Sequence, residues 1–129
     1  MTTELTMLAW ALILAVFQIA LVATLRTKEL GLAYNMGPRD TPAAPPGKIT
    51  ARLQRAQANL FETLPVFAVA VLLAHIGGRE NNMTAMGAQI YLAARVLYVP
   101  AYALGMPVVR TLVWGVSVAG IVMIIGAIV

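Results

Sequence analysis

Two stretches of the chain place polar side chains inside runs that are otherwise apolar. In the first stretch the polar residues recur at helical spacing, and at about 100° per residue they fall within an arc of roughly 80°. These residues are Arg52, Arg55, Asn59 and Glu62. Arginines bind carboxylates and an asparagine pairs with an amide, so this stripe fits an anionic, peptide-like ligand.

A second polar stripe falls within an arc of roughly 60° on the following helix. It consists of Tyr91, Arg95, Tyr98 and Tyr102. The two helices are antiparallel neighbours across a short turn, so depths can be compared at ~1.5 Å per residue. Asn59 and Arg95 then lie at the same level, and Glu62 comes within reach of Arg95. We expect an intramembrane ion pair between Glu62 and Arg95.

Two interpretations of the facing stripes remain open. Polar groups can hold membrane helices together without any further role, and Arg52 and Arg55 can place their charges at the interface with their stems in lipid. Alternatively, the stripes line a polar cavity open to the cytoplasm, because ionisable residues inside a membrane are candidates for function. Glu62 lies ~15 Å deeper than Arg52 and needs a partner or water at that depth.

The composition places these helices in a membrane. Of the 129 residues, 60% are apolar and 11% are charged, against about 25% charged in soluble domains. This excludes a soluble monomer and a disordered chain. The net charge of +4 is better explained by membrane orientation than by nucleic-acid binding.

Charged residues, glycines and prolines divide the chain into four apolar segments, each expected to be a helix. We therefore expect a single all-α membrane domain, a bundle of four transmembrane helices that covers residues 1–129. We expect helices at about 5–25, 49–76, 83–104 and 107–129, with a proline-rich loop at about 26–48. Glu4 is the only charge before the first apolar run, so that run is interpreted as a retained span and not as a cleaved signal peptide.

The basic residues orient the expected helices. Six of the nine lysines and arginines lie between Arg26 and Arg55, in or beside the first loop. Arg110 flanks the third loop on the same side, whereas the second loop has only Arg79, offset by Glu80. The positive-inside rule then places the first and third loops in the cytoplasm and both termini outside, in the periplasm of a bacterial inner membrane.

The two stripes resemble the signatures of a known family. Arg52-Leu53-Gln54-Arg55-Ala56-Gln57-Ala58-Asn59, followed by Glu62 and Pro65, resembles the second-helix motif of the MAPEG family, the membrane-associated proteins in eicosanoid and glutathione metabolism. Tyr91-Leu92-Ala93-Ala94-Arg95, with Tyr98 and Tyr102, is similar to that family's third-helix pattern. The loop Gly37-Pro38-Arg39-Asp40 and the short helices indicate a bacterial-type member. Thr63 follows Glu62 where members of the leukotriene-synthase type have a tyrosine.

The resemblance implies a homotrimer that binds glutathione, as co-substrate, between neighbouring protomers on the cytosolic side. It implies a glutathione transferase or peroxidase of the microsomal type, whose lipophilic electrophile or hydroperoxide enters from the membrane lipids. Arg110, near the glutathione sulfur, and Tyr98 are the expected catalytic residues, because a cation there would favour the thiolate. The expected glutathione-binding residues are Arg52, Arg55, Asn59, Glu62, Arg95, Tyr98 and Tyr102.

Two alternatives to the enzyme remain. One is a catalytically inactive structural or accessory membrane subunit of the same fold. The other is a small multidrug exporter, although such exporters carry their membrane glutamate in the first helix and lack a strong lysine and arginine bias. One histidine and no cysteine give no support for a metal site. We expect Trp114 to contact lipid or pack. Gly115, Ala119 and Gly120 offer small surfaces for close helix contact, which is consistent with an oligomer but not specific to one.

Overall fold

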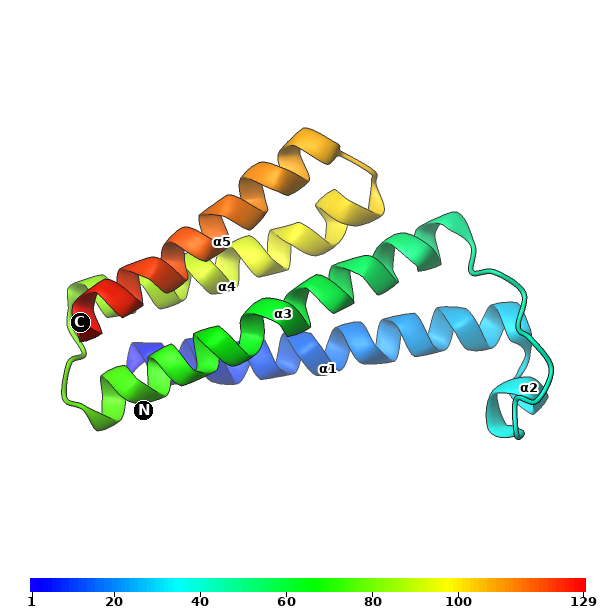
Figure 1. The fold of residues 1–129 in the computed structure, drawn as a ribbon, viewed down its shortest axis with the longest axis horizontal. Helices are drawn as coiled ribbons and strands as arrows, with labels where there is room; N and C mark the ends of the chain where they lie inside the picture. The colour runs from blue at the N-terminus through cyan, green and yellow to red at the C-terminus, as the bar shows by residue number, and fades with distance from the viewer.

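The computed structural model of the chain contains five helices and no strand (Figure 1). They are α1 (Thr3–Leu30), α2 (Leu32–Met36), α3 (Lys48–Ile76), α4 (Asn82–Ala103) and α5 (Pro107–Ile128). Helices α1, α3 and α5 are long and apolar enough to cross a membrane, whereas α4 has the length but a lower mean hydropathy. The all-α fold expected from the sequence is therefore confirmed.

Local sequence signals set the ends of the long helices. The side chain of Thr2 caps α1 by accepting a hydrogen bond from the backbone of Leu5. Asn81 and Thr84 form a reciprocal capping box at the start of α4, and Pro107 occupies the first turn of α5, where a missing amide hydrogen costs nothing. Helices α3, α4 and α5 begin and end within one residue of the expected bounds.

The segment 26–48, expected to be a loop throughout, is helical in part, and this expectation was wrong. Helix α1 continues to Leu30, past the end expected near residue 25, and α2 follows it. Arg26 pairs with Glu29 one turn later at 2.9 Å, which supports the additional turn because such pairs stabilise a helix. Gly31 then ends α1 with a φ of 88°, a conformation that glycine adopts freely.

The long helices lie in two pairs, α1 with α3 and α4 with α5 (Figure 1). The backbones of α4 and α5 touch, because a Cβ atom added to Gly87 would lie 2.6 Å from the carbonyl oxygen of Gly120. The small surface of Gly120, expected to allow close helix contact, therefore serves the packing of α5 against α4 within the chain. A Cβ atom at Gly115 would meet nothing within 4 Å.

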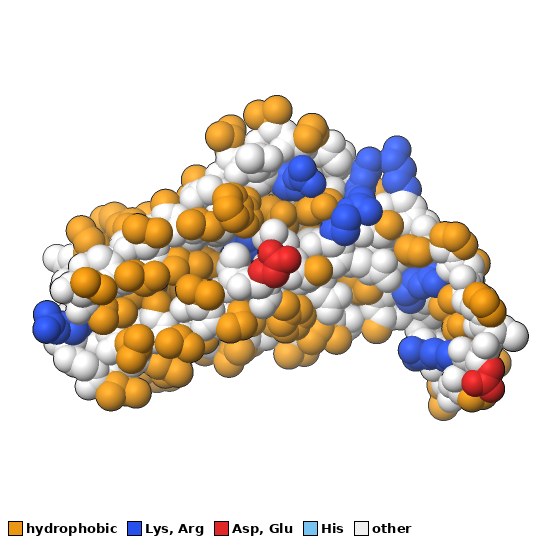
Figure 2. All heavy atoms as spheres, viewed as in Figure 1, with side chains coloured by type: hydrophobic (Ala, Val, Ile, Leu, Met, Phe, Trp, Pro, Cys, Tyr) orange, Lys and Arg blue, Asp and Glu red, His pale blue; other side chains and the backbone are white.

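The apolar core occupies one half of the molecule, toward the end that carries both chain termini, which we call the terminal end. From there the two helix pairs spread apart toward the opposite end, which carries α2 and which we call the α2 end (Figure 1). Figure 2 shows hydrophobic side chains over most of this face, with lysines and arginines mostly toward the α2 end. The core is formed by Leu8, Ala11, Ala15, Leu60, Leu64, Phe67, Ala70, Val71, Ala74, Ala88, Tyr91, Ile121 and Ile124.

Polar side chains at the terminal end form two hydrogen-bonded groups, Glu4 with Thr84 and Glu80 with Thr2 and His75, which we together call the terminal network. The hydroxyl of Thr84 donates to the buried Glu4 carboxylate at 2.6 Å. Glu80 accepts from the Thr2 hydroxyl at 2.8 Å and lies 3.1 Å from His75 Nδ1. Partial burial disfavours the charged form of Glu80, but these two hydrogen bonds outweigh it and lower the pKa of Glu80. The network thus joins α1, α3 and α4.

Candidate functional site

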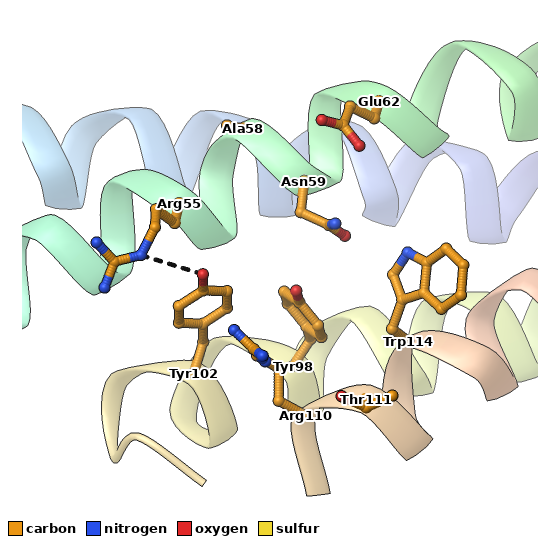
Figure 3. A pocket seen from close by; sticks show the side chains of 9 residues that line it. All are labelled: Arg55, Ala58, Asn59, Glu62, Tyr98, Tyr102, Arg110, Thr111 and Trp114. Carbon is orange, nitrogen blue, oxygen red and sulfur yellow. Dashed lines mark hydrogen bonds between the residues drawn. The ribbon is translucent and has the colours of Figure 1, made fainter. Parts of the chain in front are cut away.

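A polar cavity of about 410 Å³ lies where the two helix pairs spread apart, between α3, α4 and α5 (Figure 3). Six of its residues were expected at the site from the sequence. These six are Arg55, Asn59, Glu62, Tyr98, Tyr102 and Arg110. The structure therefore brings together most of the two polar stripes and the arginine from the start of α5.

Two arginines converge on Tyr102 at one end of the cavity. Arg55 Nε donates a hydrogen bond to the Tyr102 hydroxyl at 3.1 Å. The Cζ atom of Arg110 lies 4.8 Å from the centre of the Tyr102 ring, a cation–π arrangement. Neither arginine has a carboxylate within 4.0 Å, since Arg26, which pairs with Glu29, is the only lysine or arginine that contacts an acidic side chain. This end of the cavity therefore carries two positive charges without an acidic partner.

Arg52 lies in an adjoining cavity of about 150 Å³ that also includes Arg55, Tyr102 and Arg110. Its Nη1 atom donates to the carbonyl oxygen of Ala103 at 3.2 Å. Its guanidinium group covers Gly105, where an added Cβ atom would lie 2.7 Å from Cζ. Arg52 was expected to bind the ligand. The structure places it at the edge of the site, where it also joins α3 to the turn between α4 and α5.

Arg95 was expected to pair with Glu62, and this prediction was wrong. Its Nη1 atom donates instead to Asn59 Oδ1 at 2.9 Å, and its Cζ atom lies 4.3 Å from the centre of the Tyr98 ring. Glu62 is exposed at the cavity and has no ion-pair partner. Arg95 is 1% exposed and its Nε atom has no hydrogen-bond partner. It therefore lies behind Asn59 and Tyr98 and does not line the cavity.

Tyr91 also lies outside the cavity, although it belongs to the second stripe. Its side chain is fully buried in the core and stacks on Phe67 with 4.0 Å between ring centres. The hydroxyl groups of Tyr91 and Thr63 are 2.9 Å apart and share a hydrogen bond. Thr63 thus satisfies a buried tyrosine hydroxyl, so the residue after Glu62 serves the core in this chain.

Three residues that line the cavity were not expected there from the sequence: Ala58, Thr111 and Trp114. Trp114 was expected to contact lipid or pack, but it forms part of the wall opposite Glu62 and Asn59 (Figure 3). It follows Arg110 by four residues, so both side chains lie on one face of α5. That spacing was the signal that could have placed Trp114 at the site.

An apolar groove of about 480 Å³ lies farther along the same helices toward the terminal end. It is bounded by α3 and α5 and has almost entirely hydrophobic walls. Pro65 and Val66 begin the groove on α3, one turn beyond Glu62. The polar cavity and the apolar groove therefore follow one another along α3, whereas on α5 the groove begins at Ile125, eleven residues beyond Trp114.

Comparison with known families identifies the chain. The model of the MAPEG family matches residues 4–129, essentially the whole length. The chain belongs to the MAPEG family. Since MAPEG is a membrane family and three helices are long and apolar enough to span a bilayer, this MAPEG protein is an integral membrane protein. A search of the curated proteins finds no match to it.

Proposed function

We propose that this MAPEG protein is a membrane-embedded, glutathione-dependent transferase or peroxidase that acts on lipophilic electrophiles or hydroperoxides. The main support for this proposal is the polar cavity, where Arg55 and Arg110 lack acidic partners and Glu62 lacks a basic one. Family membership supports a glutathione-related role. We infer further that the protein is a homotrimer in a bacterial inner membrane, with the cavity facing the cytoplasm and both termini outside.

The charges around the cavity are opposite in sign to the net charge of the proposed ligand. Arg52, Arg55 and Arg110 contribute three positive charges and Glu62 contributes one negative charge, and the buried Arg95 adds a further positive charge behind Asn59, so positive charge is in excess. Glutathione as the thiolate carries two carboxylates, one thiolate and one ammonium group, which leaves two negative charges. Arginines form strong hydrogen bonds with carboxylates, and Glu62 is the available partner for the ammonium group.

Arg95 gives Asn59 a defined orientation toward this ligand. Because Asn59 Oδ1 accepts a hydrogen bond from Arg95, its Nδ2 group remains to donate into the cavity. Figure 3 shows the Asn59 amide pointing into the space between α3 and α5. A peptide carbonyl or a carboxylate of glutathione is a suitable acceptor. Arg95 therefore contributes to binding as a positioning residue, and the direct contact is made by Asn59.

Arg110 is the residue best placed to favour the thiolate. It lies in the first turn of α5, which begins with Pro107, and the positive end of the helix dipole adds to its own charge. In transfer, the thiolate sulfur forms a bond to the electrophilic carbon and the leaving group departs with the bonding electron pair. In peroxide reduction, two glutathione molecules give up two electrons and two protons, and yield glutathione disulfide, an alcohol and water.

The apolar groove between α3 and α5 gives the lipophilic co-substrate a path from the bilayer toward the polar cavity. The groove begins on α3 at Pro65 and Val66, one turn beyond Glu62, and the indole of Trp114 adds an apolar surface to the cavity wall. A molecule dissolved in the bilayer can bind there by burying apolar surface. Its reactive end then meets the sulfur without passing through water.

Two titrations test the proposal on the purified, detergent-solubilised protein. Isothermal titration calorimetry with glutathione is expected to show saturable binding below 1 mM, about the physiological range of substrate affinities. Stopped-flow absorbance should then show thiolate formation and conjugation with an aryl halide such as 1-chloro-2,4-dinitrobenzene. Absence of binding at millimolar glutathione would contradict the proposal. Binding without turnover of aryl halides or hydroperoxides would assign the chain to an accessory role.

A further inference from the structure

A second polar cavity lies at the α2 end, apart from the candidate site. It has a volume of about 410 Å³ and is enclosed by the end of α1, by α2 and the loop after it, and by α3. Arg26, Asn35, Arg39 and Gln54 supply its hydrogen-bonding groups, whereas Ala23 and Leu30 are among its apolar walls. It shares no residue with the cavity between α3, α4 and α5.

The second cavity lies at the level where α1 leaves the hydrocarbon of the membrane. No charged residue occurs in α1 between Glu4 and Arg26, so Arg26 marks the beginning of the interface. Helix α2 exposes Leu32 and Met36 to 63% and 78%, which is expected of apolar side chains that rest at a membrane surface. The cavity therefore opens among the lipid headgroups.

The basic side chains of this cavity retain hydrogen-bonding capacity. Arg39 has no carboxylate within 4.0 Å, and its Nε and Nη2 atoms bond only to Asn35, which leaves Nη1 free. Arg26 pairs with Glu29 through Nη1 and with the Ala44 carbonyl through Nη2. Its Nε atom has no partner in the chain. Two guanidinium groups can therefore donate to one anion in the cavity.

The backbone conformation of Arg39 is a second, independent indication that its side chain has a role at the cavity. Arg39 is the only residue other than glycine with a positive φ, at 58°. This left-handed conformation suits glycine, and an arginine adopts it at a cost. The hydrogen bonds from the guanidinium group to Asn35 hold the side chain at the cavity in this strained conformation.

We propose that this cavity binds the phosphate group of an anionic phospholipid, with its acyl chains along the exposed side of α1. Basic pockets beside membrane helices attract anionic headgroups, and arginine matches phosphate through paired hydrogen bonds. Val16 and Phe17 on α1 are 65% and 56% exposed and lie within the reach of an acyl chain from Arg26. A zwitterionic headgroup would place its ammonium group near two arginines and is disfavoured.

Native mass spectrometry and thermal unfolding of the full chain in detergent test this site. Added phosphatidylglycerol is expected to stay bound and raise the melting temperature, and phosphatidylcholine to do neither. Arg39→Gln should weaken phosphatidylglycerol binding about fivefold, the value of one basic residue near an anionic surface. Lys28→Gln is the matched control, because Lys28 is exposed on the same part of α1, carries the same charge and does not line the cavity.

A second variant separates binding from folding. Arg39→Gly accepts the positive φ without strain, so the melting temperature without added lipid should not fall while lipid binding is still weakened. Equal binding of the two phospholipids, or equal losses in the Arg39→Gln and Lys28→Gln proteins, would overturn the proposal. Stabilisation by inorganic phosphate as large as that by phosphatidylglycerol would also overturn the lipid assignment. Glutathione is absent from these measurements, so they do not depend on the proposed function.

Discussion

The polar groups at the two ends of the long helices differ in whether they find partners within the chain. In the terminal network, Glu4 accepts from Thr84, and Glu80 is held between Thr2 and His75. In the polar cavity, Arg55 and Arg110 share an aromatic ring and neither meets a carboxylate. A satisfied polar group stabilises helix packing, whereas an unpaired cation in an apolar protein lowers stability unless a ligand completes it. The contrast assigns stability to the terminal network and binding to the cavity.

Arg110→Ala should have the largest effect, because it removes the cation proposed to stabilise the thiolate. We expect kcat with an aryl halide to fall about 100-fold, as when one electrostatic group is removed from an active site. The dissociation constant of glutathione should change by less than kcat does. Steady-state kinetics and calorimetry on the same preparation measure both quantities. Equal losses in turnover and affinity would argue against thiolate stabilisation by Arg110.

Thr84→Val tests whether the terminal network contributes to stability and not to ligand binding. The substitution leaves the buried Glu4 carboxylate without its donor and breaks the capping box of α4. We expect the free energy of unfolding to fall by about 2 kcal/mol, measured in mixed micelles of a mild detergent and sodium dodecyl sulfate. Glutathione affinity of the folded protein should stay unchanged. A loss of affinity with intact stability would mean that the two ends are not separate in function.

Arg95→Met changes a residue that is buried, as Glu4 and Thr84 of the terminal network are, but that contacts the polar cavity through Asn59 and Tyr98. Its charge has no acidic partner and its Nε atom has no hydrogen bond, so a methionine of similar length should not lower the melting temperature. Asn59 loses the contact that orients it, and glutathione binding should weaken about tenfold. Parallel melting curves and calorimetry check this expectation. Unchanged affinity would show that Asn59 is positioned without Arg95.

The pH dependence of the terminal network should give the smallest effect. The pKa of Glu80 is lowered from 4.5 in the folded protein, so the stability that its charged form contributes is present above pH 4.5 and is lost as the pH falls through the folded-state pKa. The melting temperature of the Glu80→Gln protein should therefore approach that of the wild type as the pH falls below 4.5. A difference in melting temperature between the two proteins that stays constant through this pH range would contradict the role proposed for Glu80.

The sequence predicted the long helices and most of the site because both depend on local signals. Apolar runs, caps and charges set the helix bounds, and regular spacing placed Arg55, Asn59 and Tyr98 toward one cavity. Counting residues also gave the correct level for Asn59 and Arg95, which are in contact. It did not give the direction of each side chain around the helix, and for this reason the ion pair of Arg95 with Glu62 was predicted wrongly.

Other features depended on contacts between distant parts of the chain. The additional turn of α1 is supported by Glu29, which also accepts hydrogen bonds from Gly47 and Thr50 across the loop. These contacts are not visible in a local pattern. Likewise, Gly120 was expected to allow close contact with another helix, but its partner, Gly87 on α4, was not identified. Small residues favour close packing, but their spacing alone does not identify the partner.

The most direct test of the account compares two matched substitutions by glutathione titration. Arg55→Gln removes an unpaired cation from the cavity, and Arg79→Gln removes an exposed arginine from the turn between α3 and α4. Both lower the net charge equally. We expect Arg55→Gln to lower glutathione affinity by about tenfold or more and Arg79→Gln to leave it at the wild-type value. Equal affinities in the two variants would contradict the central claim that the unpaired arginines of the cavity bind the ligand.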